Sequence, residues 1–289
     1  MLTVQDKVSS PVRLEAYDAP FHIGAVSLRV RDLPRLTAFY RDAIGLTLIT
    51  EEPGLSVLGV DGVPLVRLEA GASAPISAAG LFHLAILLPS RGDLANWLAH
   101  AARTRVPLEG ASNHLVSEAL YLSDPEGNGI EIYRDRSRPE WPRLDGGAIK
   151  MSTDRLDLDQ LLRESDGAAY PGMPSGTGMG HVHLRVGDTA QAEGFYRDGL
   201  GFDVMVHYPG ASFLATGGYH HHIAVNVWGS RGAGLRADSD AGLASFELVA
   251  TDDQAFATMR TRMIAAGGRD EGGTVTVADP WNNRLILRR

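Results

Sequence analysis

The chain has 289 residues with a net charge of −8, and 44% of its residues are hydrophobic. This composition is typical of a folded globular protein that is long enough for one large or two ordinary domains. No basic cluster is dense enough to neutralise a row of phosphates, so we do not expect nucleic acid as a partner. There is no cysteine, which excludes disulfides, thiolate catalysis and cysteine-ligated metals. Any metal must therefore be bound by histidine, carboxylate or water.

The start of the chain does not resemble a targeting segment. Residues 1–17 lack a basic stretch followed by an apolar one, so no signal peptide is predicted. No run of residues approaches the roughly 18 apolar residues of a membrane-spanning helix. We therefore expect a cytoplasmic protein without a membrane partner.

Internal repetition is the feature that decides the fold. Residues 22–49 and 179–205 both run from an alternating apolar strand through an aspartate into an amphipathic helix containing FYRD, followed by a second strand. We expect these helices to end at Gly45 and Gly201, because glycine readily adopts the left-handed conformation found after a helix C-terminus.

Two weaker copies of this pattern, residues 81–106 and 243–268, also begin with a strand and a helix. Each closes with an Asp-Pro turn, at Asp124 and Asp279, followed by Gly/Asn-rich residues that enter a last strand. The chain is therefore expected to contain four modules, each with one strand, one helix and roughly three further strands, which is an α+β fold.

A long connection separates the second module from the third. We expect a first pair of modules over residues 21–134, a linker over 135–177 and a second pair over 178–289. The linker starts with polar residues, contains a predicted short helix near residues 156–165 and ends in a Gly/Pro-rich stretch. A connection of this length usually has a function, and we interpret it as allowing the second and third modules to face each other.

The second module carries the most specific motif. In order, it contains His114, Leu120-Tyr121, Asp124-Pro125, Gly127 and Glu131. This order and spacing resemble the ring-cleavage signature of extradiol dioxygenases, with one departure, because Ser112 stands where that signature prefers Gly, Asn, Thr, Ile or Val. Together with the repeats, the motif makes the chain similar to the vicinal oxygen chelate superfamily (glyoxalase, bleomycin-resistance and extradiol dioxygenase proteins). Within it, the chain looks most like two-domain bacterial catechol 2,3-dioxygenases.

The resemblance covers residues 21–289 and implies a fold in which four βαβββ modules curl in pairs into two cup-shaped, mixed-sheet barrels. It also implies that Glu131 binds a metal on the concave face, with His114 and Tyr121 beside it. The sequence around Glu131 agrees, since a charged side chain in an otherwise apolar strand needs a partner or a metal to offset its burial. An isolated glutamate would more often lie on the solvent-exposed face of an edge strand.

Two histidines occupy equivalent places in separate modules. Aligning the first strands on the Asp or Ser before each helix gives the equivalent positions Ala25, His83, His181 and Ser245. The resemblance makes this a ligand position, so His83, His181 and Glu131 form the two-histidine, one-carboxylate set of non-haem Fe(II) sites; Mn(II) shares this set. The counterpart of Glu131 in the fourth module is Ile286, which cannot bind a metal. The site is therefore expected between the second and third modules.

Several other histidines are candidates. His183 shares a strand face with His181 and is a second-rank ligand. The segment at residues 220–222 is three consecutive histidines, which cannot all face one side of a strand. It resembles a segment in which the family carries a catalytic outer histidine, and His221 matches that role, with His222 as the alternative. A surface histidine cluster without a function is the other interpretation.

The resemblance implies an enzyme that opens a catechol-type aromatic diol with O2, although a hydroquinone substrate stays open. His221 and His114 would transfer protons, because histidine titrates near neutral pH, and Tyr121 would donate a hydrogen bond to a substrate oxygen. One alternative is a glyoxalase-like metal-dependent isomerase or epimerase, which usually has a fourth protein ligand. Another is a bleomycin-resistance-type binding protein, which would lack the metal ligands. Superfamily members often pair subunits, so a homo-oligomer also stays open.

Overall fold

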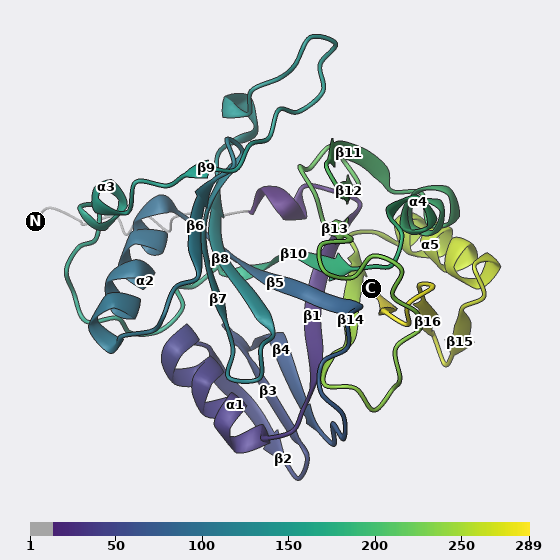
Figure 1. Ribbon diagram of the computed structural model, residues 1–289, viewed down its shortest axis with the longest axis horizontal. Coiled ribbons are helices and arrows are strands. Elements are labelled where there is room, and N and C mark those ends of the chain that lie inside the picture. Colours follow the sequence, from purple (N-terminus) through teal and green to yellow (C-terminus); the bar gives the residue numbers. More distant parts are fainter. Residues whose placement is uncertain (1–13) are drawn as a thin grey trace, which may run out of the picture.

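Four repeats of a strand, a helix and three strands build the protein in this computed structural model, which describes residues 14–289 (Figure 1). The first module contains β1 (Phe21–Val30), α1 (Leu33–Phe39) with a π turn (Tyr40–Ile44), β2 (Thr47–Glu52), β3 (Leu55–Val60) and β4 (Val63–Ala70). The second contains β5 (Gly80–Leu88), α2 (Arg91–Thr104), β6 (Gly110–Asn113), β7 (Ser117–Ser123) and β8 (Gly129–Asp135).

The other two modules repeat this order. The third contains β10 (Gly178–Arg185), α4 (Thr189–Glu193) with a π turn (Gly194–Gly199), β11 (Asp203–Tyr208), β12 (Ala211–Ala215) and β13 (Ile223–Asn226). The fourth contains β14 (Gly242–Ala250), α5 (Asp253–Ala265), β15 (Arg269–Glu271), β16 (Thr274–Ala278) and β17 (Arg284–Arg288). The predicted α+β fold of βαβββ modules is confirmed.

The residues that begin and end the helices explain why each module folds locally. The side chain before each helix accepts a hydrogen bond from the backbone N–H three residues later, at Asp32, Ser90, Asp188 and Asp252. These N-caps are the residues that align the repeats in the sequence. Gly45 and Gly201 follow the helical segments with φ of +95° and +81°, so both predicted left-handed positions are confirmed.

The strands form two mixed sheets, and each sheet joins modules that are not neighbours in the chain. The 9-stranded sheet has the order β11-β12-β13-β10-β5-β8-β7-β6-β9, and the 8-stranded sheet has the order β15-β16-β17-β14-β1-β4-β3-β2. Antiparallel pairing of β5 with β10 joins the second and third modules, and pairing of β1 with β14 joins the first and fourth. Each sheet therefore takes one module from residues 21–134 and one from residues 178–289.

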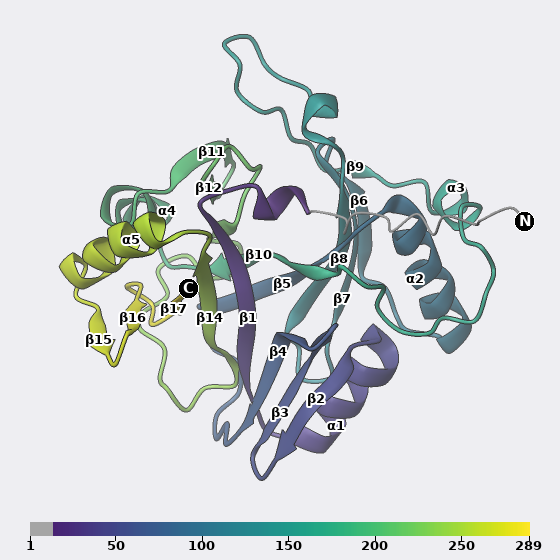
Figure 2. The ribbon, with the colours of Figure 1, turned by 180° about the vertical axis from the view of Figure 1, so that it is seen from behind.

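The two sheets pack against each other where their central strands meet. In both views β5 and β10 pass across β1 and β14 (Figure 2). Ile23 and Val26 of β1 belong to the same buried cluster as Leu84 and Ile86 of β5. Because strand side chains alternate, the intervening residues of β5 project from the other face of the 9-stranded sheet, where the candidate site lies.

The linker is structured and belongs to the 9-stranded sheet. It contains a 3-10 turn (Arg138–Glu140), the short strand β9 (Asp154–Arg155), which pairs with β6, and the short helix α3 (Leu158–Leu162). Figure 1 and Figure 2 show α3 beside α2, while the chain between β8 and β9 projects away from the sheets. A further 3-10 turn, Glu15–Tyr17, precedes β1.

No helix within residues 14–289 is long and apolar enough to cross a membrane. The prediction that residues 1–17 are not a signal peptide concerns a segment of which residues 1–13 lie outside the described residues.

The repeated FYRD and Asp-Pro motifs form two equivalent buried hydrogen bonds. The Tyr40 hydroxyl donates to Asp124 Oδ2 at 3.2 Å, and the Tyr196 hydroxyl donates to Asp279 Oδ2 at 3.0 Å. Burial raises the pKa of both aspartates above the ordinary value. These bonds join the first module to the second and the third to the fourth, so the two motifs recur because they are partners.

We expect Tyr40→Phe and Tyr196→Phe each to lower the free energy of unfolding by about 1–2 kcal/mol, because each leaves a buried carboxylate with one donor fewer. Urea unfolding monitored by circular dichroism measures the change. Tyr208→Phe, on a half-exposed side chain, is the matched control. Equal stability of all three variants would contradict a stabilising role for these bonds.

Candidate metal centre and cavity

Three adjacent strands bring the predicted ligands together. His83 lies on β5, Glu131 on β8 and His181 on β10, and β5 is paired with both of the other strands. Ala85 is opposite Glu131 on one side and opposite His181 on the other. A small side chain at this central position leaves space above the sheet, and the three larger side chains surround that space.

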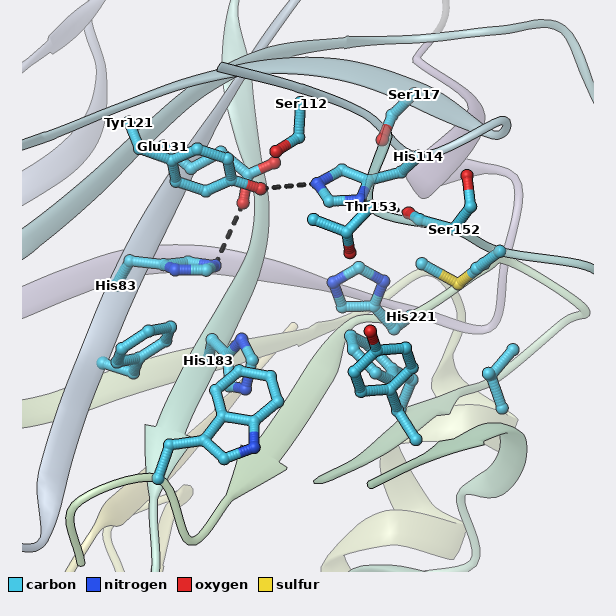
Figure 3. Close-up of a pocket in the computed structure, with 16 residues that line it drawn as sticks. His83, Ser112, His114, Ser117, Tyr121, Glu131, Ser152, Thr153, His183 and His221 are labelled. Atoms are coloured by element: carbon cyan, nitrogen blue, oxygen red, sulfur yellow. Dashed lines mark hydrogen bonds and ion pairs between the residues drawn. The ribbon is translucent and has the colours of Figure 1, made fainter. Parts of the chain in front are cut away.

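The donor atoms of these residues lie close together. His83 Nε2 is 3.0 Å and His181 Nε2 is 3.2 Å from the same Glu131 oxygen, Oε2. One donor atom from each of the three residues can be chosen so that all lie within 4.8 Å of one another, and all three side chains are buried. Figure 3 shows the ring of His83 directed at the Glu131 carboxylate.

The arrangement fits a divalent metal. The buried His83 Nε2 atom contacts the Glu131 carboxylate without hydrogen-bond geometry and has no other partner among the described residues. Metal–nitrogen and metal–oxygen bonds of about 2.1 Å place neighbouring ligand atoms about 3 Å apart, which matches the separations seen here. Two imidazoles and one carboxylate are also the donor set preferred by non-haem iron. These residues therefore meet the requirements of a metal site.

Electrostatics at the site favour an ionised Glu131 carboxylate beside a neutral His181 ring. Burial opposes ionisation of Glu131, but the neighbouring His181 and His83 hold its pKa well below the ordinary value. Burial lowers the pKa of His181 to about 4, although Glu131 acts in the opposite direction. An anionic carboxylate and neutral imidazoles are the forms that bind metal ions.

His183 lies beside the site but its Nε2 already has a partner. The Asn226 amide oxygen accepts a hydrogen bond from the Trp228 backbone N–H at 3.0 Å, which fixes the orientation of the amide. The Asn226 amide nitrogen then donates to His183 Nε2 at 2.9 Å. His183, the second-rank ligand predicted from the sequence, therefore has one ring nitrogen fewer available to bind a metal. His181 completes the cluster instead.

A cavity of about 260 Å³ opens beside His83 and Glu131. Polar groups gather on one side, as Figure 3 shows for His114, Tyr121 and Ser112. Large apolar and aromatic side chains from β5, β11, β12, the loop after β13 and the linker form much of the remaining wall: Phe82, Val206, Tyr208, Phe213, Trp228 and Met151. Among the described residues that line the cavity, none is a lysine or arginine and Glu131 is the single acidic one.

His114 and Tyr121 form a hydrogen-bonded pair in the wall. His114 Nδ1 lies 2.7 Å from the Ser152 carbonyl oxygen, which can only accept, so this nitrogen carries hydrogen. His114 Nε2 is then the acceptor for the Tyr121 hydroxyl at 2.7 Å. Burial, with the charge of Glu131, raises the pKa of Tyr121 well above its ordinary value, which keeps the phenol protonated.

The three consecutive histidines point to different places. His221 lines the cavity, and the centroid of its ring lies 4.0 Å from that of His181. His222 is completely buried elsewhere: its Nε2 lies 2.9 Å from the Ala16 carbonyl oxygen, and its Nδ1 accepts from the Thr216 N–H at 3.3 Å. His222, the alternative to His221 in the sequence, is therefore not brought to the cavity.

Most residues of the cavity wall, and the residues that contact His221 from behind, were not predicted from the sequence. Met151, Ser152 and Thr153 come from the linker, and its unusual length is the signal that indicates a function there. His220 and Asp135 lie behind His221 and contact each other. No local pattern marks Asp135, which is the last residue of β8.

Comparisons with a family model and with curated proteins indicate the same superfamily. The model of the Glyoxalase/Bleomycin resistance protein/Dioxygenase superfamily matches residues 22–132 and 178–287. A catechol-2,3-dioxygenase of Bacillus subtilis (strain 168) is 39% identical over 274 residues, which is 92% of this chain and 96% of that protein. A biphenyl-2,3-diol 1,2-dioxygenase of Rhodococcus globerulus is 30% identical over 121 residues, 37% of this chain and 60% of that protein.

Solved structures share the fold at low sequence identity. Glyoxalase I from Zea mays superposes with a TM-score of 0.55 at 15% identity, covering 94% of this chain and 93% of that one. The cppA protein from Streptococcus pneumoniae TIGR4 gives a TM-score of 0.56 at 12% identity, with 92% and 98% covered.

We expect His83→Ala to weaken binding of a divalent metal at least about 100-fold, because removing an inner ligand should cost more than removing an outer partner. Metal content after dialysis, measured by elemental analysis, tests this. His207→Ala is the matched control, since the His207 side chain is 69% exposed. Full metal content in His83→Ala would show that the ligand assignment is wrong.

Acid should destabilise the metal-free protein through His222. Burial lowers the pKa of His222 to about 3 in the folded state, so the unfolded chain takes up a proton first as the pH falls below about 6.5. Stability from this group is therefore present above pH 6.5 and falls by about 2 kcal/mol by pH 5.

Urea unfolding at pH 7.5 and 5.0 measures this loss. His222→Gln keeps one donor and one acceptor near the Ala16 and Thr216 backbone, and it should reduce the difference in stability between the two pH values. An unchanged difference would contradict this role for His222.

Proposed function

Because this chain belongs to the Glyoxalase/Bleomycin resistance protein/Dioxygenase superfamily, we propose that it is an extradiol dioxygenase that opens the ring of a catechol-type diol with O2. In this proposal His83, Glu131 and His181 hold a non-haem Fe(II), or Mn(II) with the same ligand set. The observation that carries the proposal is the convergence of two imidazoles and one carboxylate beside a cavity that His83 and Glu131 line and whose remaining wall is largely apolar. The 39% identity to a catechol-2,3-dioxygenase along most of the chain supports it.

The metal, when bound, would lower the pKa of the diol hydroxyls and bring the diol and O2 together. Two of the three ligands, His83 and Glu131, lie in the cavity wall, where a small aromatic diol can reach a metal that they hold. Burial of the three ligands would keep bulk water away from a metal that they hold. The side chains around the site then need to orient the ring and transfer protons.

His221 is the side chain best placed to accept a proton from a diol hydroxyl. It lines the cavity next to His181, and its Nδ1 is engaged by His220, which leaves Nε2 as the free nitrogen. Burial is the main cause that holds the pKa of His221 well below its ordinary value, and the surrounding histidines lower it further. The ring is therefore neutral before substrate binds, as a base must be.

Tyr121 and His114 can stabilise an oxygen on the other side of the site. In the free protein the Tyr121 hydroxyl donates to His114, so its oxygen can accept. Protonation of His114 would make both ring nitrogens donors, and the Tyr121 hydroxyl could then rotate to donate to a substrate oxygen. This pair can therefore deliver a proton late in the reaction rather than remove one early.

The apolar wall indicates a neutral ring substituent. Phe82, Phe213 and Trp228 can pack against an aromatic ring, and Val206 and Met151 extend this surface. A carboxylate on the ring would find no lysine or arginine among the described residues that line the cavity. Burying such an unpaired charge would be costly, so acidic catechols should be poor substrates.

Protein purified without oxygen and loaded with Fe(II) tests the proposal. We expect catechol and alkyl-catechols to consume one O2 per molecule, and mass spectrometry with ¹⁸O2 should show both atoms in a ring-opened product cleaved beside the hydroxyl pair. His221→Phe should keep its metal and lose about 10²–10⁴-fold in kcat.

His100→Phe, on a side chain outside the cavity, is the control for His221→Phe. Absence of O2 uptake with Fe(II) and with Mn(II), across catechols and hydroquinone, would exclude the proposed reaction. Isomerisation of a substrate without O2 would instead identify a glyoxalase-like enzyme.

A further inference from the structure

A chain of buried hydrogen bonds runs from Asp135 to the cavity. Asp135 Oδ1 lies 2.8 Å from His220 Nε2, and His220 Nδ1 lies 2.7 Å from His221 Nδ1. The His220 side chain is completely buried and that of Asp135 is 7% exposed. His221, at the end of the chain, lines the cavity beside His181. Asp135 and His220 do not line the cavity themselves.

With Asp135 ionised and His220 neutral, the hydrogen-bond types determine where each hydrogen lies. An ionised carboxylate only accepts, so His220 Nε2 carries hydrogen and donates to Asp135. A neutral His220 then has a lone pair on Nδ1, and His221 Nδ1 must donate to it. His221 Nε2 is left without hydrogen, with its lone pair available to the cavity. This is the tautomer that can accept a proton from a bound diol.

A doubly protonated His220 would give the opposite tautomer of His221. The side chains nearest to His220 include the rings of Tyr133, Trp141 and Tyr219. Asp135 also shares its charge, since its second oxygen accepts from the Tyr219 hydroxyl at 2.9 Å. The position of the hydrogen on His221 therefore reports which form of His220 is present.

The surrounding structure holds this chain rigidly. The Tyr219 hydroxyl also lies 2.9 Å from the hydroxyl of Tyr133, and Trp141 from the linker packs on His220. Gly180 on β10 allows Tyr133 to approach, because a Cβ atom at position 180 would overlap the Tyr133 hydroxyl. Residues from β8, β10, the linker and the segment before β13 thus orient one histidine.

We propose that Asp135 and His220 are positioning residues that hold His221 in the Nδ1–H tautomer, with Nε2 free to act as the base toward the substrate. Asp135 acts through His220, and neither contacts the substrate. The role of the base rests on the proposed function, whereas the tautomer is a property of the protein alone.

Nuclear magnetic resonance of ¹⁵N-histidine-labelled, metal-free full-length protein tests the tautomer without turnover. The His221 signals are assigned by their loss in His221→Phe. We expect hydrogen on Nδ1 of His221 in the wild type. In Asp135→Asn, the amide should keep its oxygen toward Tyr219 and donate to His220, which moves the hydrogen of His221 to Nε2. His220→Phe should give a mixture of tautomers.

Steady-state kinetics of the Fe(II)-loaded protein test the consequence. Asp135→Asn and His220→Phe should lower kcat about 10²-fold, with KM within about threefold and metal content unchanged. In the His221→Phe background the same substitutions should change kcat less than about twofold, because their effect passes through His221. Asp145→Asn, on an exposed side chain, is the matched control.

Hydrogen on His221 Nε2 in the wild type, or a tautomer unchanged in both Asp135→Asn and His220→Phe, would overturn the proposal. So would effects on kcat that multiply fully with that of His221→Phe, because these would indicate a general loss of structure. If no diol supports turnover, the dioxygenase assignment fails, and the spectrum still decides whether Asp135 and His220 set the tautomer.

Discussion

The antiparallel pairing of β5 with β10 is the constraint on which the site depends. It sets two modules from opposite halves of the chain edge to edge and places His181 across from Ala85. The parallel pairing of β5 with β8 places Glu131 on the other side of Ala85. A shift of this register by one residue would turn one ligand to the opposite face of the sheet. The metal set is therefore a consequence of strand register.

This pairing places an anionic carboxylate in a buried position that the protein leaves incompletely compensated. Glu131 is 2% exposed and has two imidazoles as its nearest partners. Imidazoles in the neutral form that binds metals offset only part of the cost of burying a charge. A divalent cation would complete the balance and would also bind His83 Nε2, whose contact with Glu131 lacks hydrogen-bond geometry. The folded state is thus preorganised for a cation at some expense to its own stability.

Features that repeat, or that match the ring-cleavage signature, could be predicted from the sequence. The residue before each helix recurs in all four modules, so alignment on it gives His83 and His181 as equivalent positions, and the signature of the second module gives Glu131. The segment containing His220, His221 and His222 lies just before β13 begins at Ile223, so the alternation of strand side chains does not apply to it. Asp135 was not recognised because its partners are distant in sequence and nothing local distinguishes it from a surface aspartate.

The 8-stranded sheet shows what the same architecture does without the metal set. It too has a buried glutamate near its centre, Glu247 on β14, but the oxygens of Glu247 are fully used. Arg67 and Arg288 donate to Oε1 at 2.8 and 3.0 Å, and the Ala25 N–H donates to Oε2 at 3.2 Å. Arginine brings its own positive charge and needs no ion, whereas imidazoles in their metal-binding, neutral form leave that charge to be supplied. The difference between a structural sheet and a metal site in this chain is therefore the kind of basic residue that faces the buried carboxylate.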